Sequence, residues 1–235
     1  IVNGIDYEIY NPMKDKYIYK NFSVRNTSGK IADKRSLQEK EGLKVDKDAM
    51  LIGIVSRMTN QKGFDLVAYM MEEMLSTMNV QFAVLGTGEE QYVDMFNYFH
   101  DKYPDKLSVF IGYSEEKAHE IYAGCDAFLM PSLFEPCGLS QLMSMRYGTL
   151  PIVRETGGLK DTVQPYNEYE DVGTGFSFSD FNAHDMLHVI QYALDVFTNH
   201  KDRWQEMIER AMRQDFSWNT SAGEYEKLYD MICGN

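Results

Sequence analysis

The chain of 235 residues is long enough for one large α/β domain or two small ones, and its 44% hydrophobic content suffices for a buried core. Its formal net charge is −13 at pH 7. Because a negative field repels polyanions, nucleic acid and anionic membrane surfaces are excluded as expected partners, whereas a small phosphate ligand held by local donors is not.

The first 48 residues form an irregular, polar segment that precedes an α/β domain over residues 49–235. Within this segment the run KIADKRSLQEKEG predicts one charged helix over 30–42, which ends at Gly42. From Met50 onward, short apolar runs alternate with amphipathic stretches. We therefore place the boundary between the two parts near residue 48.

The apolar runs predict a series of buried strands. The first run, LIGIV at 51–55, is apolar throughout, as in a strand covered on both faces. Further strands are predicted over 81–85, 107–111, 126–130, 150–153 and 175–178, and helices over 89–102, 115–123, 139–147, 182–198, 200–213 and 219–232. The helical spacing of Leu66, Met70, Met74 and Leu75 predicts one more helix after the first strand. This alternation predicts an α/β fold, with a Rossmann-like parallel sheet of about six strands and helices on both faces.

In such a sheet, ligands bind beyond the carboxyl ends of the strands, so the loops that follow strands carry the functional prediction. The loop after the first strand contains Arg57 and Lys62. Two cations beside a helix start can grip a pyrophosphate, Arg57 by forked hydrogen bonds and Lys62 as a point charge. A solvated loop whose charges pair with surface carboxylates explains them equally well.

The next two loops give weaker signals. The run Gly86-Thr87-Gly88 permits a tight turn and close backbone approach, and alone it indicates no more than a turn. Tyr113, in the loop after the third strand, can stack on a nucleobase. Since the chain has 16 tyrosines, chance also explains its position.

Two later loops add a carboxylate and glycines. Glu135 lies at the same sheet edge, and Gly138 lets the amides that follow face an anion, although a helix cap alone also explains Glu135. Gly157 and Gly158 can present amides to a phosphate or form a flexible turn. Together the loops suit a nucleoside diphosphate that carries a polyhydroxyl group. The P-loop pattern is absent, and no GxGxxG follows the first strand, which disfavours NTPases and dinucleotide dehydrogenases.

Three stretches carry a family resemblance. The runs NGIDYEIYNP, SRMTNQKGFDL and FEPCGLSQLMSMRYGTLPIVRETGGLKDTV closely resemble bacterial glycogen synthases and plant starch synthases, in the same order along nearly the whole chain. The resemblance implies the GT-B architecture, in which two Rossmann-like domains face each other across a cleft. This chain resembles the C-terminal, nucleotide-sugar-binding domain over 49–235, with 1–48 as the connecting segment.

The resemblance also implies roles for individual residues. Arg57 and Lys62 match the residues that contact the diphosphate of ADP-glucose, and Glu135 matches the carboxylate beside the donor glucose. Three further groups match contacts to the donor: the backbone of Cys137, Gly138 and Leu139 for glucose and phosphate, Tyr113 on the adenine side, and the loop of Thr156, Gly157 and Gly158 near the donor. Neither a metal nor another cofactor is expected, because Arg57 and Lys62 would neutralise the phosphates.

The implied reaction transfers glucose from ADP-glucose to the non-reducing end of an α-1,4-glucan with retention. Many related retaining transferases have a second Glu eight positions after the first, where this chain has Met143. The first domain of the family, which holds the glucan acceptor, is missing from these 235 residues, so we expect the chain alone to be inactive. Two alternatives stay open: a non-catalytic nucleotide-binding module, and a related transferase that uses a UDP-sugar.

Other features bound the setting of the protein. The three cysteines, Cys125, Cys137 and Cys233, form neither a disulfide framework nor a CxxC pair, which favours a reducing compartment, the cytoplasm. No apolar run is long enough for a membrane span and no signal peptide is visible. The chain starts at Ile1 without Met, as a fragment or a processed chain would.

Two expectations concern surfaces. Most of the five histidines fall on predicted helices, where surface positions are expected rather than a metal site: His100, His119, His184, His188 and His200. The closing helix is amphipathic, and we expect part of its apolar face to be uncovered.

Overall fold

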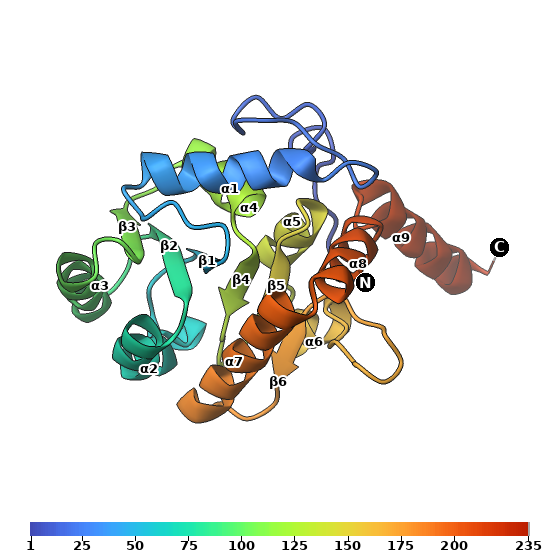
Figure 1. Ribbon diagram of the computed structural model, residues 1–235. Helices are drawn as coiled ribbons and strands as arrows, with labels where there is room; N and C mark the ends of the chain where they lie inside the picture. Colours follow the sequence, from blue (N-terminus) through green and yellow to red (C-terminus); the bar gives the residue numbers. More distant parts are fainter. Residues whose placement is uncertain (235) are drawn as a thin grey trace.

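The computed structural model describes residues 1–234, in which one parallel sheet of six strands has the order β3-β2-β1-β4-β5-β6 (Figure 1). Every pairing between neighbouring strands is parallel. The strands are β1 Met50–Val55, β2 Val80–Gly86, β3 Leu107–Ile111, β4 Ala127–Met130, β5 Leu150–Arg154 and β6 Phe176–Phe178. The predicted α/β class with a Rossmann-like sheet is confirmed, and the strands lie within about one residue of their predicted bounds.

Helices surround this sheet. They are α1 Ser28–Lys40, α2 Phe64–Thr77, α3 Glu90–Lys102, α4 Glu115–Gly124, α5 Ser140–Arg146, α6 Gly157–Thr162, α7 Ala183–Asn199, α8 Lys201–Met212 and α9 Trp218–Cys233, with a 3₁₀ turn η1 at Asn60–Lys62. Helix α2 packs on α3 and α7, α4 packs on α1 and α5, and α8 packs on α5 and α7. The turn η1 and the short helix α6 are additions to the predicted elements.

Burial explains the apolar runs. Strand β1 lies between β2 and β4, and its residues Met50, Leu51 and Ile52 are completely buried. Strand β3 is at the edge of the sheet, where Phe110 and Ile111 are exposed. A central strand with helices on both faces therefore reads as a continuous apolar run, and an edge strand does not have to.

The segment before residue 48 packs on the same core as the sheet. Helix α1 contacts α4, and the side chains Ile5, Ile18, Phe22, Leu37 and Leu43 belong to the buried apolar cluster. The division of the chain near residue 48 stays a prediction. The structure shows that residues on both sides of it share one core.

The expected surface position is wrong for His119. This side chain is 1% exposed, and its Nδ1 lies 2.6 Å from Oδ2 of Asp15, which also accepts a hydrogen bond from the hydroxyl of Tyr147. These hydrogen bonds lower the pKa of the Asp15 carboxyl below its usual range, against the opposing effect of burial. Asp15 lies 104 residues from His119, so local sequence gave no sign of the contact.

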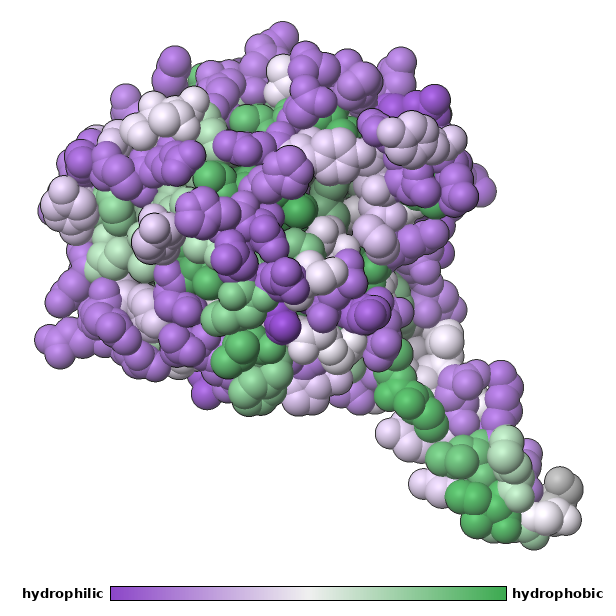
Figure 2. Space-filling view, turned by 90° about the horizontal axis from the view of Figure 1, so that it is seen from below, coloured by the Kyte–Doolittle hydropathy of each residue, from purple (hydrophilic) through white to green (hydrophobic). Residues whose placement is uncertain are grey.

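Helix α9 projects from the body of the molecule (Figures 1 and 2). Within Trp218–Cys233, which the structure describes completely, only Ser221 is buried. The exposed side chains of this helix include Leu228, Tyr229, Met231 and Ile232. Figure 2 shows hydrophobic surface on the projecting arm. The uncovered apolar face predicted for the closing helix is thus confirmed. No helix of residues 1–234 combines the length and the apolar character needed to cross a membrane.

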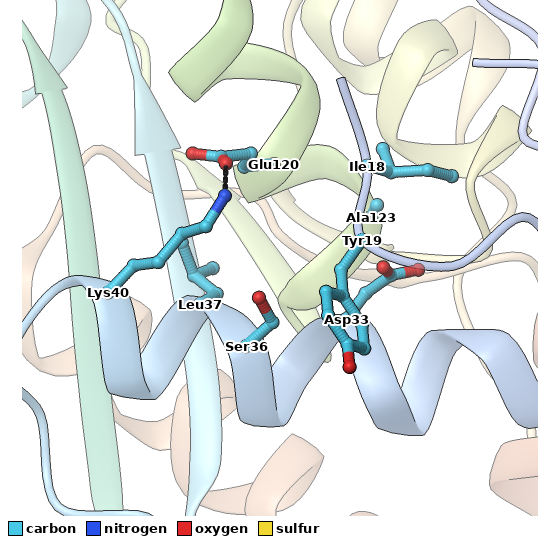
Figure 3. A pocket seen from close by; sticks show the side chains of 8 residues that line it. All are labelled: Ile18, Tyr19, Asp33, Ser36, Leu37, Lys40, Glu120 and Ala123. Atoms are coloured by element: carbon cyan, nitrogen blue, oxygen red, sulfur yellow. Dashed lines mark hydrogen bonds and ion pairs between the residues drawn. The ribbon is translucent and has the colours of Figure 1, made fainter. Parts of the chain in front are cut away.

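A buried carboxyl group on α1 predicts a pH effect on stability. Asp33 is 4% exposed and lines a water-sized cavity of about 10 Å³ between α1 and α4 (Figure 3). Its Oδ1 accepts a hydrogen bond from the Lys20 amide, whereas its Oδ2 has no partner among residues 1–234. Burial raises the pKa of Asp33 to about 6. The folded state therefore favours the neutral form of this side chain.

The free energy of unfolding is expected to fall as pH rises from about 4 to about 6, because the folded protein then loses a proton that it holds more tightly than the unfolded chain. Asp33→Asn removes this loss, so the variant is expected to be more stable than the parent by about 1–3 kcal/mol at pH 7 and equal to it at pH 4. Urea unfolding at both pH values measures the difference, with the exposed Asp101→Asn as control. An equal difference at both pH values would contradict the assignment.

Candidate functional site

The loops that follow the strands meet at one edge of the sheet, because all six described strands run in the same direction. Backbone hydrogen bonds link each loop to its neighbour. These bonds are Leu133 N to Gln61 O at 2.9 Å, Met58 N to Thr87 O at 2.8 Å, Gly112 N to Gly86 O at 2.9 Å and Gly158 N to Glu135 O at 3.1 Å. The five loops that sequence reasoning singled out are therefore held together as one surface.

The centre of this surface is an ion pair between Lys62 and Glu135. Lys62 ends the turn η1 just before α2, and Glu135 lies in the loop after β4. The side chains are 17% and 10% exposed, and the two residues are 73 positions apart. The hydroxyl of Ser132 lies 3.4 Å from the same carboxylate oxygen. The structure thus brings together two of the predicted site residues, with a cation at the start of a long helix.

Two further predicted residues lie at the exposed rim. Arg57 follows β1 and is exposed, and within residues 1–234 it forms no ion pair. Tyr113 follows β3 and is 89% exposed. A guanidinium and an aromatic ring in contact with water can both receive a ligand without breaking an internal contact.

The glycines of the loop after β5 allow two loops to touch. A Cβ atom on Gly157 would lie 2.2 Å from the carbonyl oxygen of Glu135, and one on Gly158 would lie 2.1 Å from that of Cys137. The amide of Gly158 donates to the Glu135 carbonyl. These glycines therefore fix the backbone that carries Glu135, and contacts of Thr156, Gly157 and Gly158 with a donor stay a prediction.

Gly158→Ala is expected to lower the free energy of unfolding by about 1–3 kcal/mol and to weaken ligand binding, since the new methyl group forces the Glu135 loop away. The matched control is Gly223→Ala in α9, where a Cβ has nothing within 4 Å and alanine favours the helix. Chemical denaturation of the two variants checks this. Equal stability of both variants would contradict the role of Gly158.

The loop before α5 is held by a side chain that sequence reasoning missed. Gly138 has φ +73°, a conformation that favours glycine, and Leu139 precedes α5. Completely buried Gln141 donates from Nε2 to the carbonyls of Cys137 and Gly138, at 3.0 and 3.1 Å. The sequence offered only one sign of this, the position of Gln141 inside the block that carries the resemblance.

Arg154 is a second missed residue. It ends β5, and its Nη1 donates to the carbonyl of Leu133 at 2.6 Å and lies 3.4 Å from that of Ser132. Its guanidinium also lies over the ring of Phe181, 5.6 Å from the centroid. Arg154 thus secures the loop that leads to Glu135 from the side opposite to Lys62. No local pattern distinguishes it from a surface arginine.

At the centre of this edge, the groups free to meet a ligand are the Glu135 carboxylate, the cations Arg57 and Lys62, and backbone amides. Among residues 1–234, no group of three or more His, Cys, Asp and Glu side chains is placed to hold a metal ion. Glu135 and Lys62 neutralise each other as the structure stands. An incoming diphosphate can compete with Glu135 for the Lys62 ammonium, and a polyhydroxyl group can then offer hydrogen bonds to the carboxylate.

Comparisons with known proteins show the family of the chain and the fold it shares with solved structures. The family described as Glycosyl transferases group 1 matches residues 35–211. The glycogen synthases of Lachnospira eligens and Lachnoclostridium phytofermentans are 59% and 53% identical to the chain over 233 residues. These matches cover 99% of the chain and 48% of each relative, so the chain spans about half the length of the curated relatives it matches. The solved catalytic domain of starch synthase IV from Arabidopsis thaliana, bound to ADP and acarbose, is 31% identical with a TM-score of 0.92, and covers all of this chain and 49% of its own.

Proposed function

The chain belongs to the group 1 glycosyltransferases, and we propose that it is the donor-nucleotide-binding half of a glycogen synthase that uses ADP-glucose. The observation that carries the proposal is the buried pair of Lys62 and Glu135, where the loops after β1 and β4 meet. A sugar nucleotide needs a cation for its diphosphate and a hydrogen-bond acceptor for its sugar at neighbouring positions. The glycogen synthases similar over 99% of the chain support the same reading.

In the proposed reaction, Arg57 and Lys62 bind the diphosphate and stabilise the negative charge that develops on it as the bond to glucose breaks. Glu135 accepts hydrogen bonds from glucose hydroxyls and stabilises the positive charge of the oxocarbenium-like sugar. The 4-OH of the glucan attacks from the face that ADP leaves, and a phosphate oxygen takes its proton. The new glycosidic bond then has the configuration of the old one. We propose no metal ion, because the two cations neutralise the diphosphate.

The rest of the catalytic cleft would come from a second domain, which would hold the α-1,4-glucan acceptor. The uncovered face of α9, with Leu228 and Ile232, supplies an apolar surface that such a domain can cover. Positioning of the two substrates contributes about 7–11 kcal/mol to catalysis in well-oriented reactions. We therefore expect this chain alone to bind nucleotide without transferring glucose.

We place the protein in the cytoplasm, because its three cysteines are free thiols, as in a reducing compartment.

Calorimetric titration of the chain with ADP and with UDP tests the proposal. Saturable ADP binding with clearly weaker UDP binding is expected, since the similar starch synthase domain was solved with ADP. Equal or tighter UDP binding would move the donor to a UDP-sugar. If the chain alone binds ADP and also transfers glucose to glycogen at normal rates, the proposal that transfer requires a second domain is wrong.

A further inference from the structure

A second recess lies at the opposite end of the sheet from the Lys62–Glu135 pair. Its volume is about 820 Å³, and it opens between α1 and the turn that joins α7 to α8. Asp48 and Asp126, which line it, come just before β1 and β4, whereas the proposed nucleotide site uses loops that follow strands. We call this recess the α1–α8 groove. Its volume falls in the range of small-molecule sites.

The lining of the α1–α8 groove is basic in an acidic protein. Five of the described residues that line it are cations and two are carboxylates, whereas the whole chain has a net charge of −13. The cations are Lys30, Lys34, Arg35, Lys47 and Lys201. A concave cluster of one sign raises the local concentration of ions of the opposite sign. The charge of the groove therefore selects an anion.

The lysines of the groove differ in how many of their N–H donors already have partners. Lys34 donates to the carbonyls of Lys47 and Ala49 at 3.1 and 2.7 Å and pairs with Asp126 at 2.7 Å, so all three of its N–H groups have partners. Its contribution is structural. Nζ of Lys201 forms an exposed ion pair with Oδ1 of Asp48, at 3.2 Å.

Lys30 has donor capacity left. It is 7% exposed, and its Nζ donates to the carbonyl of Ala123 at 2.9 Å and to Oγ1 of Thr149 at 2.6 Å. An ammonium group has three N–H donors, and the third has no acceptor among residues 1–234. Burial lowers the pKa of Lys30 to about 8, against the opposing effect of the Asp126 and Asp33 carboxylates. A bound anion would supply the missing partner.

The other walls suit the organic part of such a ligand. Thr27 and Gln205 hydrogen-bond to each other across the groove from the start of α1 and from α8. Phe197 and Trp204 pack edge to face, with ring centroids 5.2 Å apart, and form an apolar wall. An amide, a hydroxyl group and an aromatic wall together can hold a small polar molecule that carries an anionic group.

We propose that the α1–α8 groove is a second anion site that binds a small phosphate-bearing metabolite, with the phosphate against Lys30 and Lys47. Phosphate is the anion that matches a cluster of lysine point charges and remaining N–H donors. The ligand would bridge α1, which packs on α4, and α8, which packs on α5, α7 and β5. This site is separate from the nucleotide site and goes beyond the proposed transfer reaction.

The experiment uses Trp204 as a reporter in this chain, which has its own buried core. The chain has two tryptophans, so Trp218→Phe leaves Trp204, in the groove wall, as the only one. Titration with inorganic phosphate and with pyrophosphate, at constant ionic strength, is expected to change its fluorescence saturably. In this background, Lys47→Glu is expected to weaken the response roughly tenfold or more. Lys47 is exposed, so the substitution leaves the core intact.

Two control variants decide where the anion binds. Lys44→Glu makes the same charge change on an exposed residue three positions away that is not part of the groove lining, and it is expected to keep the response. Lys62→Ala, at the nucleotide site, is also expected to keep it. Lys201→Glu is a second groove variant and is also expected to weaken the response. It replaces Lys47→Glu as the test if that variant proves unstable.

Three results would overturn the proposal. The first is a Trp204 signal that does not saturate with either anion. The second is a Lys44→Glu variant that weakens the signal as much as Lys47→Glu does. The third is loss of the signal in Lys62→Ala while both groove variants keep it. The second result would mean general screening of charge, and the third would mean that phosphate binds at the nucleotide site. Failure of ADP binding in calorimetry would test only the proposed function and would leave the groove titration unaffected.

Discussion

Lys62→Ala is expected to weaken ADP binding by roughly 10- to 100-fold. Two effects act in the same direction. The variant loses a charge-assisted hydrogen bond to the diphosphate, an interaction of about 1.5–3 kcal/mol. It also leaves the Glu135 carboxylate, 10% exposed, without its cation, so a negative charge then faces the incoming phosphates.

Calorimetric titration of the variant and its parent with ADP measures the effect. Lys44→Ala removes the same charge from an exposed position near the other end of the sheet, and it is expected to bind ADP as the parent does. Unfolding curves must show that Lys62→Ala stays folded. Equal ADP affinity in all three proteins would place the diphosphate elsewhere and remove the main support for the proposed site.

Glu135→Gln is expected to separate binding from transfer. In the longer protein it should lower the rate of glucose transfer by roughly 100- to 1000-fold, the usual effect of removing one charge-stabilising group from a transition state. In this chain ADP should bind at least as tightly as it does to the parent, and up to about tenfold more tightly. The reason is that a carboxylate no longer competes with the diphosphate for the Lys62 ammonium.

The control for this prediction is Glu155→Gln, in the next loop along the sheet edge. Glu155 accepts a hydrogen bond from Ser177 at 2.8 Å and lies 4.0 Å from Lys160, away from the central pair. Both ADP affinity and transfer rate are expected to stay close to those of the parent. Loss of ADP binding in Glu135→Gln would mean that the pair with Lys62 maintains the pocket rather than competing with the ligand.

The sheet could be predicted from sequence because its strands are short apolar runs that alternate with amphipathic helical stretches along the chain. LIGIV is buried on both faces in β1, as its composition requires. The loops could be predicted for the same reason, since a parallel sheet places the residues after every strand at one edge. Chain order therefore placed Arg57, Lys62, Tyr113 and Glu135 at this edge, whereas their roles toward a donor came from the resemblance and stay predictions.

The contacts inside that edge could not be predicted. Arg154 bonds a backbone carbonyl of another loop and Gln141 bonds carbonyls of the loop just before its own helix, and any residue provides a carbonyl, so no sequence pattern marks these bonds. The structure shows that Gly157 and Gly158 admit a neighbouring carbonyl oxygen, a packing role that their sequence did not indicate. Buried His119 depends on Asp15, which is remote in sequence. For Arg154, the two glycines and His119, the missing information was the identity of a neighbour remote in sequence.

Helix α9 has a consequence for hydrogen exchange. Isolated helices of about this length are marginally stable in water, and α9 has only Ser221 buried among its described residues Trp218–Cys233. Its distal amides should therefore exchange by local opening, far faster than those of β1, which require global unfolding. A partner that covers Leu228 and Ile232 would slow exchange in this helix before any other. The protection of these few amides would thus report the docking of a second domain in real time.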